Sequence, residues 1–591
     1  MGYRRNAPKL VFGGLKSLEY RGYDSWGAAV VSDGKIFVKK KVGKIGNAQV
    51  NDLPDGSIAF GHTRWATHGG VTEINAHPHL DCTGTIAVIH NGIFENYEEF
   101  KKKLIKKGHK FVSQTDTEVI PHMIEEFMHS PPRWKVPHTS GVFVGAVRSV
   151  FLQMKGLNAV IAINTKSKSV IAVRNGSPLC IGFGKRENFL ASDASALLPY
   201  TKDIYFLEDD EMTVIEDKKV AVFNVKNGKK IKYKKQRLNW KLDQGEKGKY
   251  PFFMLKEIYE QPQIIGDIAA NYLGQAKKTA KLIKKAKGTY LVGCGTASYA
   301  CLAGEYLFSK IAKKHVNFSV GSEFGYHLDF LNKESLVLAL SQSGETMDIL
   351  ESVKKAKKKG AKIASLVNVL GSSLYRLSNY KMLIGAGPEK GVASTKAFTG
   401  MIAHLVLLAY SLVNRSGDGQ KVLVEAVKST KEVLSPKIVK RITALAQKIM
   451  NKRHIYVIGR GISYPTSLET ALKIKEISYI HAEGLAAGEL KHGPLALVEK
   501  GTPCIAFLPN DETYGANLAG AMEMKARGGF VVGISFKPHE VFDYYLPVSD
   551  AKEATIIPNV VAAQLLAYYL TVKKGLDPDK PRNLAKSVTV K

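Results

Sequence analysis

The sequence predicts an α+β region followed by a duplicated, doubly wound α/β unit, and three observations indicate this fold class. Short strand-like runs surround two helical segments in residues 1–235. From about residue 280 strands and helices alternate, which is typical of a mostly parallel sheet. The same strand–turn–helix order recurs later, so we interpret residues 280–430 and 440–575 as two copies of one unit.

Apolar alternation and helical periodicity define the first region. The predicted strands are 27–31, 35–40, 85–89, 204–206, 212–215 and 220–223, and the predicted helices are 96–107 and 117–128. The strand at 85–89 ends at His90-Asn91-Gly92. Strands of this kind predict much antiparallel sheet.

A polar, Gly- and Lys-rich stretch then predicts a linker, followed by a helix at 254–259 that ends before Pro262. The strands predicted in the α/β copies are 288–292, 335–340, 364–367, 454–458 and 502–508. The predicted domains are 1–235, a linker at 236–250, 251–430 and 431–591. A length of 591 residues fits this number of domains.

The net charge is strongly positive, with 85 Lys and Arg against 53 Asp and Glu and a formal charge of +32. Such a charge can indicate nucleic-acid or membrane binding. Here it is spread along the chain, and only 16 of the 85 are Arg, the residue favoured for bidentate phosphate and base contacts. We therefore predict neither nucleic-acid nor membrane partners and read the charge as a property of the whole surface.

Five cysteines at irregular spacing form neither a CxxC motif nor a zinc-type pattern with His. We predict no metal, no cofactor and no disulfide framework. The N-terminus lacks an apolar signal core, and the longest apolar stretch, Met401–Val413, contains His404 and is too short to span a bilayer. A cytoplasmic location is expected.

The loop Ser341-Gln342-Ser343-Gly344-Glu345-Thr346 lies between a predicted strand and helix. Its hydroxyls and free backbone N–H groups suit a small phosphomonoester, although an N-cap alone also explains one such residue. The earlier loop, Gly293-Cys294-Gly295-Thr296, lacks the third Gly of a dinucleotide fingerprint and suits a sugar phosphate as well. The second copy has Pro509-Asn510-Asp511 instead, so one sugar site is expected.

Glu469, Lys473 and Glu476 are spaced i, i+4 and i+7, which places them on one helix face, and His492 follows. The spacing fits a surface ion pair and acid–base chemistry on a sugar equally well.

In the first region, Arg64 can clamp a carboxylate, Asn91 and Gly92 can form an oxyanion hole, and Asp116 can hold an ammonium group. The nearby histidines lack a Cys or carboxylate that would complete a metal site.

Together these segments resemble the glutamine–fructose-6-phosphate aminotransferase (isomerizing) family, the glucosamine-6-phosphate synthases, over about residues 5–591. The matching segments are LEYRGYDS (18–25), HTRWATHGG (62–70), NAHPH (75–79), HNG (90–92), TDTE (115–118), KEIYEQP (256–262), SQSGET (341–346), GVASTKAF (391–398), KEISYIHAEG (475–484), GELKHGPLAL (488–497) and PRNLAKSVTV (581–590).

The resemblance implies an N-terminal-nucleophile hydrolase glutaminase domain (an αββα sandwich) and two sugar-isomerase (SIS) domains. It implies that ammonia from glutamine travels through an internal channel to fructose 6-phosphate, giving glucosamine 6-phosphate and glutamate, the first step of hexosamine synthesis. It also implies a homodimer, since SIS domains commonly pair.

The resemblance further assigns the site residues. Those for glutamine are Arg21, Arg64, Trp65, Thr67, His68, His77, Asn91, Gly92 and Asp116. Those for the sugar phosphate are Cys294, Gly295, Thr296, Ser341, Gln342, Ser343, Thr346, Val392, Ser394, Glu469, Lys473 and Ala585. His492 would open the ring, Glu476 would move the proton between C1 and C2, and Lys586 would form a Schiff base. Trp65 would gate the channel.

The chain departs from the family at its start, because the family begins Cys-Gly-Ile after removal of Met, whereas this chain begins Met1-Gly2-Tyr3. Either the true start lies upstream, or the chain uses free ammonia or only isomerises sugars. Cys82 is no substitute because it has no free α-amine. Smaller departures are Trp26 and a Pro-rich insertion at 130–142.

Overall fold

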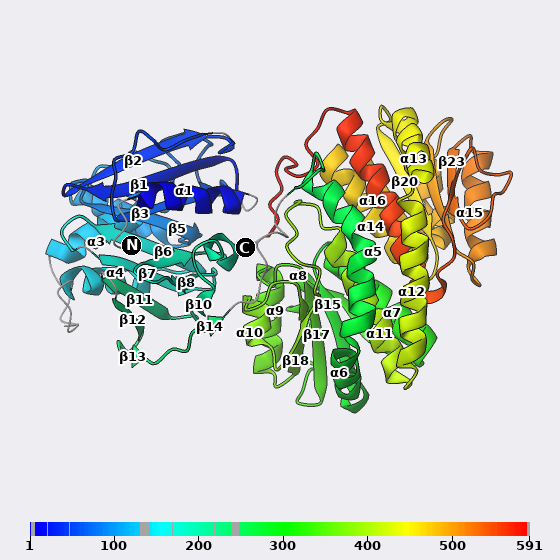
Figure 1. The fold of residues 1–591 in the computed structure, drawn as a ribbon, viewed down its shortest axis with the longest axis horizontal. Helices are drawn as coiled ribbons and strands as arrows, with labels where there is room; N and C mark the ends of the chain where they lie inside the picture. Colours follow the sequence, from blue (N-terminus) through cyan, green and yellow to red (C-terminus); the bar gives the residue numbers. More distant parts are fainter. Residues whose placement is uncertain are drawn as a thin grey trace. The chain divides into compact units, whose positions relative to one another are not determined.

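The computed structural model describes residues 1, 6–19, 22–46, 48–129, 141–167, 169–216, 219–237 and 247–587. They belong to two compact units, residues 1–243 and 244–587, each described by itself (Figure 1). The division falls within the predicted linker. Arg21 and most of the predicted insertion at 130–142 lie outside the described residues.

Unit 1 contains one large and two small antiparallel sheets (Figure 1). The large sheet has the order β13 (Lys230–Ile231), β12 (Lys219–Asn224), β11 (Glu211–Glu216), β7 (Ser169–Asn175), β6 (Asn158–Asn164), β5 (Ile86–Gly92) and β4 (His79–Leu80). The small sheets are β2 (Lys35–Val42), β1 (Ser25–Ser32) and β3 (Ile58–Arg64), and β14 (Gln236–Arg237), β10 (Asp203–Phe206), β8 (Cys180–Phe183) and β9 (Asn188–Ala191).

The alternation of side chains on the large sheet builds two apolar layers. On β6, Val160 and Ala162 face a core formed with α2 (Tyr97–Lys106), α3 (Val119–His129) and α4 (Gly141–Gln153). Ile161 and Ile163 face the small sheets. The outer face of the β1 sheet is covered by α1 (Ala7–Leu18), where Phe12 and Leu15 pack on Trp26, which is 1% exposed. The predicted αββα order is therefore confirmed.

Unit 2 contains two five-stranded parallel sheets of identical topology. The first has the order β16 (Asn317–Val320), β15 (Gly288–Gly293), β17 (Ser335–Ser341), β18 (Lys362–Val367) and β19 (Tyr380–Leu383). The second has the order β21 (His481–Ala486), β20 (His454–Gly459), β22 (Pro503–Leu508), β23 (Phe530–Ser535) and β24 (Tyr544–Pro547). Both follow the doubly wound order 2-1-3-4-5, so the predicted duplication is confirmed.

Helices cover both sheets of unit 2 (Figure 1). Their bounds are α5 (Phe253–Asn271), α6 (Leu273–Lys285), α7 (Thr296–Ala312), α8 (Gly321–Phe324), α9 (Met347–Lys358), α10 (Ser373–Leu377), α11 (Lys396–Leu412), α12 (Ser416–Val433), α13 (Pro436–Ile449), α14 (Ser463–Ser478), α15 (Tyr514–Ala526) and α16 (Ile556–Lys573). The predicted boundary at 430/431 falls inside α12. One apolar core joins residues of both copies, among them Leu405 on α11 and Val560 on α16.

The prediction that a helix ends before Pro262 is wrong, because α5 continues through this proline. A proline inside a helix leaves the carbonyl four residues earlier without its N–H donor. That carbonyl belongs to Ile258, and the side-chain amide of Gln261 donates to it at 3.1 Å. The replacement hydrogen bond allows the helix to run on.

The helix at Lys552–Lys573 is long and apolar enough to cross a membrane by length and composition, but 89% of its apolar window is buried inside the unit. Its side chains belong to the apolar cores of unit 2, so we interpret it as a core helix.

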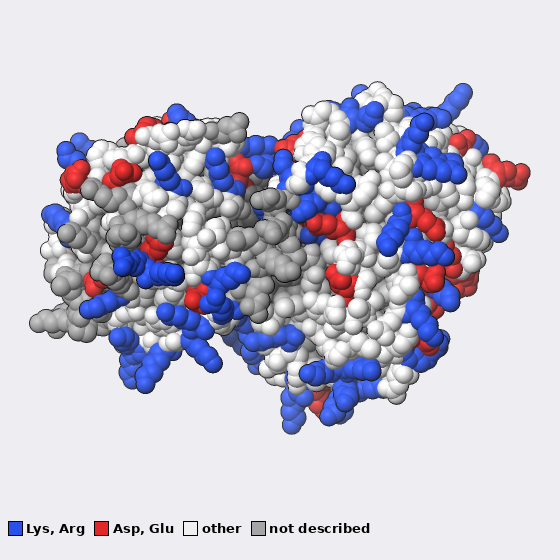
Figure 2. All heavy atoms as spheres, in the orientation of Figure 1, with Lys and Arg blue, Asp and Glu red and all other residues white. Residues whose placement is uncertain are grey.

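The positive charge is distributed as predicted. Lys and Arg side chains occur over both units on the face shown in Figure 2, with Asp and Glu between them. A single basic stripe, as expected for nucleic-acid binding, is not visible on this face.

Candidate active sites

The predicted oxyanion residues Asn91 and Gly92 end strand β5, which lies next to the edge strand β4 in the large sheet of unit 1. Nε2 of His62 lies 2.8 Å from Asn91 Oδ1, which leaves the amide NH₂ as the group that can donate to a ligand. Gly92 has φ of 130°, and a Cβ there would lie 2.1 Å from the carbonyl oxygen of Leu157. Only glycine fits this position, so backbone geometry requires it independently of any catalytic role.

Buried imidazoles lie behind this strand end. The His90 backbone N–H donates to Nδ1 of His77 at 3.3 Å, and His77 stacks on His62 with ring centroids 4.2 Å apart. Burial lowers the pKa of His62 to about 4 and that of His77 well below its usual range. These rings are therefore neutral at physiological pH, and Arg64 is the cation of this site.

Arg64 is buried at the end of β3 and braces the next loop by donating to the carbonyl oxygens of Gly70 at 3.1 Å and Gly69 at 3.2 Å. Burial lowers the pKa of Arg64, while Asp24 and Asp116 act in the opposite direction. Asp116 accepts the Phe94 N–H at 2.8 Å. The Arg64 cation and the Asp116 anion are thus close enough for their charges to affect each other. The zwitterionic end of an amino acid requires such a pair of charges.

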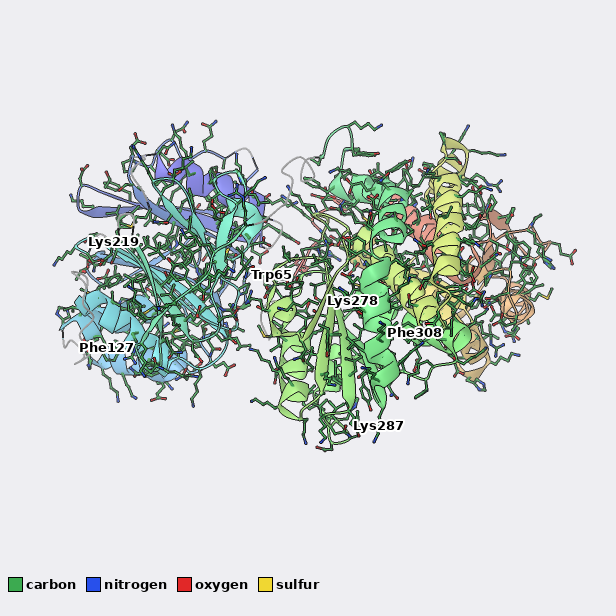
Figure 3. The ribbon with its side chains drawn as sticks, turned by 60° about the horizontal axis from the view of Figure 1, so that its bottom comes forward. Trp65, Phe127, Lys219, Lys278, Lys287 and Phe308 are labelled. Carbon is green, nitrogen blue, oxygen red and sulfur yellow. The ribbon has the colours of Figure 1, made fainter. Side chains whose placement is uncertain are left out.

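The remaining predicted glutamine residues described by the structure are more exposed. Trp65, labelled in Figure 3, meets Tyr23 edge-on with centroids 6.1 Å apart. Thr67 Oγ1 lies 3.4 Å from Nδ1 of His68, whose ring meets Tyr97 edge-on. Cys82 contacts His109 and His122 instead of this cluster.

In unit 2 the face of α14 is buried, which decides between the two interpretations of its spacing. Lys473 is 1% exposed, and its Nζ lies 3.5 Å from Glu469 Oε1 and 2.5 Å from Glu476 Oε2. Nζ also donates at 3.0 Å to Oγ1 of Thr296, which belongs to the first copy. This is an internal cluster, and a surface ion pair is excluded.

The two carboxyl groups of this cluster differ. Burial raises the pKa of Glu469 to about 8, opposed by Lys473. Burial alone lowers the pKa of Lys473, but Glu469 and Glu476 outweigh it and the net shift is upward. The Glu469 side chain has no exposed surface, whereas 21% of the Glu476 side chain remains exposed. Glu476 is therefore the carboxylate that a ligand can reach.

Lys586 lies in the C-terminal tail, which has no helix or strand in the described part, as predicted. Its Nζ lies 2.6 Å from Glu389 Oε2, which also accepts the Ser394 hydroxyl at 2.9 Å. Glu389 Oε1 accepts the backbone N–H groups of Thr395 and Ala397. Although burial opposes it, Lys586 lowers the pKa of Glu389 on balance, and Glu389 in turn contributes to the upward shift of Lys473.

Hydrogen bonds at Asp579 hold the C-terminal tail in place before it reaches this site. The Val392 N–H donates to the carbonyl oxygen of Asp579, and the Asp579 carboxylate accepts the N–H groups of Phe253 and Met254. These contacts hold Ala585 and Lys586 beside the loop at 389–394. Only 2% of the Lys586 side chain is exposed.

The two hydroxyl-rich loops follow neighbouring strands β15 and β17, at the point where the sheet order reverses. Ligands of open α/β sheets bind at the carboxyl ends of strands at this point. Ser341 Oγ accepts the Gly344 N–H at 3.0 Å, and Ser343 Oγ accepts the Glu345 N–H at 3.1 Å. Thr346 is the N-cap residue of α9, but its side chain makes no capping hydrogen bond, and Gln342 is half-buried. Burial, together with Asp348, raises the pKa of Cys294 to about 11.

The structure does not bring His492 to this cluster. His492 ends a short 3-10 helix, η4 (Ala487–His492), and its side chain is exposed. Within residues 247–587 its side chain makes no hydrogen bond or ion pair with Glu476 or Lys586. The family resemblance assigned these three residues to one site, and His492 stays a prediction.

Sequence reasoning missed Glu389, the buried partner of Lys586, and Glu257. Burial, with Glu389, raises the pKa of Glu257 to about 8, and its carboxylate accepts the Gly391 N–H. An acidic residue just before the GVASTKAF segment was the available signal, but its partner lies 197 residues away along the chain.

Comparison with known proteins adds the following. A glutamine amidotransferase domain model matches residues 62–199, and a SIS domain model matches residues 282–411 and 448–572. The chain is 43% identical to a Pyrococcus horikoshii protein named glutamine–fructose-6-phosphate aminotransferase (isomerizing), over 99% of this chain and 98% of that protein. A Thermococcus kodakarensis protein of the same name is 42% identical, again over 99% of this chain and 98% of that protein.

Among solved structures, the C-terminal domain of a glucosamine-fructose-6-phosphate aminotransferase from Francisella tularensis is similar, with a TM-score of 0.53 and 34% identity. It covers 56% of this chain and 99% of that one.

Proposed function

The chain belongs to the glutamine–fructose-6-phosphate aminotransferase (isomerizing) family, and from this premise we propose that it converts fructose 6-phosphate and a nitrogen donor to glucosamine 6-phosphate. The observation that carries the proposal is the buried pairing of Lys586 with Glu389 beside the Thr296–Lys473–Glu476 cluster. With glutamine as the donor, the second product is glutamate.

The sugar phosphate binds at the Ser341–Thr346 loop, where hydroxyls and the N-terminus of α9 favour an anion. Gly295, with φ of 53°, turns the neighbouring loop so that Thr296 begins α7 beside Glu469. The phosphate thus anchors the sugar with its carbonyl directed toward the α14 cluster and the tail.

Lys586 is the nucleophile in this proposal. In the free chain its ammonium is paired with Glu389. After proton loss, the amine attacks C2 of the open-chain ketose, and water leaves as the imine forms. Ammonia then displaces the lysine, and the C2 imine of the sugar remains.

Glu476 takes a proton from C1 and returns one to C2, which converts the ketose imine to the 2-amino aldose. Lys473 holds Glu476 in place through the 2.5 Å contact. Glu469, whose pKa is raised, accepts a hydrogen bond from Thr296 and interacts with Lys473, which holds both side chains in place.

In unit 1, Arg64 and Asp116 would bind the α-carboxylate and α-amine of glutamine, and Asn91 with Gly92 would stabilise the oxyanion. The nitrogen donor is glutamine or free ammonia, and an assay of glutamine hydrolysis by the purified chain distinguishes the two. The channel and the gating role of Trp65 remain predictions.

The test supplies the purified chain with fructose 6-phosphate and either ammonium or glutamine, and measures glucosamine 6-phosphate. Formation with ammonium is expected. Interconversion of hexose phosphates without nitrogen incorporation, even at high ammonium, would favour a sugar-phosphate isomerase. Binding without any turnover would favour a sugar-phosphate sensor.

We also propose a cytoplasmic homodimer with small-molecule substrates. Since the His492 side chain is exposed, a second copy of the chain is one route by which it reaches the sugar. Mixing His492→Ala chains with Lys586→Ala chains tests this. Recovered activity supports a shared site, whereas no recovery in a verified mixed dimer contradicts it.

A further inference from the structure

Four side chains with metal-binding atoms gather in unit 1 and have no role in the function above. They are Cys82, His109, His122 and Glu125, and their ligand atoms all lie within 4.8 Å of one another. Cys82 follows β4, His109 lies between α2 and α3, and the other two are one turn apart on α3. This helix also carries Phe127, which is labelled in Figure 3. We call the four side chains the Cys82 cluster.

Five of the six distances between ligand atoms of the Cys82 cluster match the edges of a tetrahedral zinc site, and the sixth, between Cys82 Sγ and Glu125 Oε2, is at most 4.8 Å. Cys82 Sγ lies 3.4 Å from Nδ1 of His109 and 3.4 Å from Nδ1 of His122, and the two Nδ1 atoms are 3.3 Å apart. Glu125 Oε2 lies 3.3 Å and 3.6 Å from the same two nitrogens. A tetrahedron with zinc bonds of about 2.3 Å to sulfur and 2.0–2.2 Å to nitrogen and oxygen has edges of about 3.3–3.6 Å.

The outer nitrogens of both histidines face carboxylates. Nε2 of His109 lies 3.1 Å from Glu126 Oε1, and Nε2 of His122 lies 3.9 Å from Glu118 Oε1. A carboxylate behind a histidine favours the tautomer with its proton on the outer nitrogen, which turns the Nδ1 lone pair inward. Two inward lone pairs 3.3 Å apart repel unless a proton or a metal ion lies between them, and a metal ion satisfies both at once.

Burial and access also suit a metal. His122 and Glu125 are buried and His109 is 8% exposed, while Cys82 lies at the surface. Three ligands are thus held by the core, and the thiol side provides a path for the ion.

We propose that the Cys82 cluster binds one Zn²⁺ through the Cys82 thiolate, Nδ1 of His109 and His122, and Glu125 Oε2. The thiol proton leaves to solvent on binding. Thiolate and imidazole ligands favour Zn²⁺ over Mg²⁺ or Ca²⁺, and four protein ligands make a structural site rather than a catalytic one. Asp116 lies between His109 and His122 in the chain, so the ion would fix the segment that carries this glutamine-site residue.

The test uses the full chain, purified without chelator, and measures bound zinc and then the absorption of the cobalt-loaded protein. About one zinc per chain is expected, with thiolate-to-cobalt charge-transfer bands and the intense visible bands of tetrahedral Co²⁺. Cys82→Ser should lose the charge-transfer bands, and His122→Gln should weaken binding at least tenfold. Cys180→Ser and His129→Gln are the matched controls and should bind as the parent chain does.

A parent chain that retains no zinc and gives no charge-transfer bands would overturn the proposal, as would bands that persist in Cys82→Ser. If a variant fails to fold, alkylation of Cys82 in the parent chain decides. Zinc should protect this exposed thiol from iodoacetamide, and Mg²⁺ should not. Equal modification with and without zinc would contradict the site, whatever the activity of the enzyme.

Discussion

The two α/β copies of unit 2 share a strand order, but the loops at their equivalent sheet edges differ. In the first copy, Ser341 and Ser343 accept N–H groups of their own loop, and the turn passes through Gly344 with φ of 66°. In the second copy, Asp511 Oδ1 accepts the N–H of Thr513 at 2.8 Å, and Glu512 pairs with Lys310 at 2.9 Å. A carboxylate thus occupies the position where an anionic ligand would bind.

The second copy contributes in another way. Its helix α14 supplies Glu469, Lys473 and Glu476, and Lys473 bonds to Thr296 of the first copy. In the proposed function, the first copy supplies the phosphate loop and the second the acid–base groups. The two copies share a fold, while the residues of these loops and of one helix face differ.

The largest expected effect tests the tail that reaches this shared site. Lys586→Arg keeps a cation beside Glu389, but a guanidinium does not form the imine, so the rate of glucosamine 6-phosphate formation should fall on the order of 10⁴-fold or more. Lys574→Arg, exposed at the end of α16, is the control and should retain activity. A Lys586→Arg chain with near-normal turnover would remove lysine catalysis from the proposal.

The next effect tests the contribution of the second copy. Glu476→Gln keeps the shape and a hydrogen-bonding group for Lys473 but removes the base, so kcat should fall roughly 10³-fold with little change in KM for fructose 6-phosphate. Glu483→Gln, on the neighbouring strand β21, is the matched control. If both variants behave alike, α14 has a structural role only.

A smaller effect compares the two loops directly. Ser343→Ala removes a hydroxyl from the predicted phosphate site, and KM for fructose 6-phosphate should rise about tenfold, as expected for one hydrogen bond to a charged group. Thr513→Val removes a hydroxyl from the corresponding loop of the second copy, at the N-cap of α15, and should leave KM unchanged. Equal shifts from steady-state kinetics would mean that the copies share phosphate binding.

The smallest effect concerns pH. Burial, with the charge of Glu389, raises the folded-state pKa of Glu257 from 4.5 to about 8. Between these values the folded chain holds the proton more tightly than the unfolded chain does, so stability falls as pH rises from about 5 to 8. Glu257→Gln has no carboxyl proton to lose. From pH 5 to pH 8 its Tm should therefore fall by roughly 2 °C less than the Tm of the parent chain.

The exposed Glu512 in the second copy provides the contrast for this measurement. Its side chain is 69% exposed, so water and salt screen its charge. Glu512→Gln should leave the pH slope of Tm unchanged when unfolding is followed by calorimetry at pH 5 and pH 8. Parallel slopes for the parent chain and Glu257→Gln would show that Glu257 does not titrate in this window.

Much of the fold could be predicted from the sequence. Strand alternation predicted β1 and β2, and repeated strand–turn–helix order predicted both parallel sheets, because these patterns depend on neighbouring residues. The helix across Pro262 could not be predicted, since it depends on the Gln261 side chain replacing a lost backbone donor. The outward position of His492 depends likewise on how η4 packs.

The sequence by itself determined which residue types follow each strand and which side chains share the face of α14, because short-range spacing sets both. Only the tertiary structure decided that Lys473 is buried, that Lys586 meets Glu389, and that Cys82 lies beside His109 and His122. Burial and contact depend on the packing of segments far apart in the chain. The same positive charge that first suggested nucleic acid thus includes two buried lysines, Lys473 and Lys586, that lie beside carboxylates.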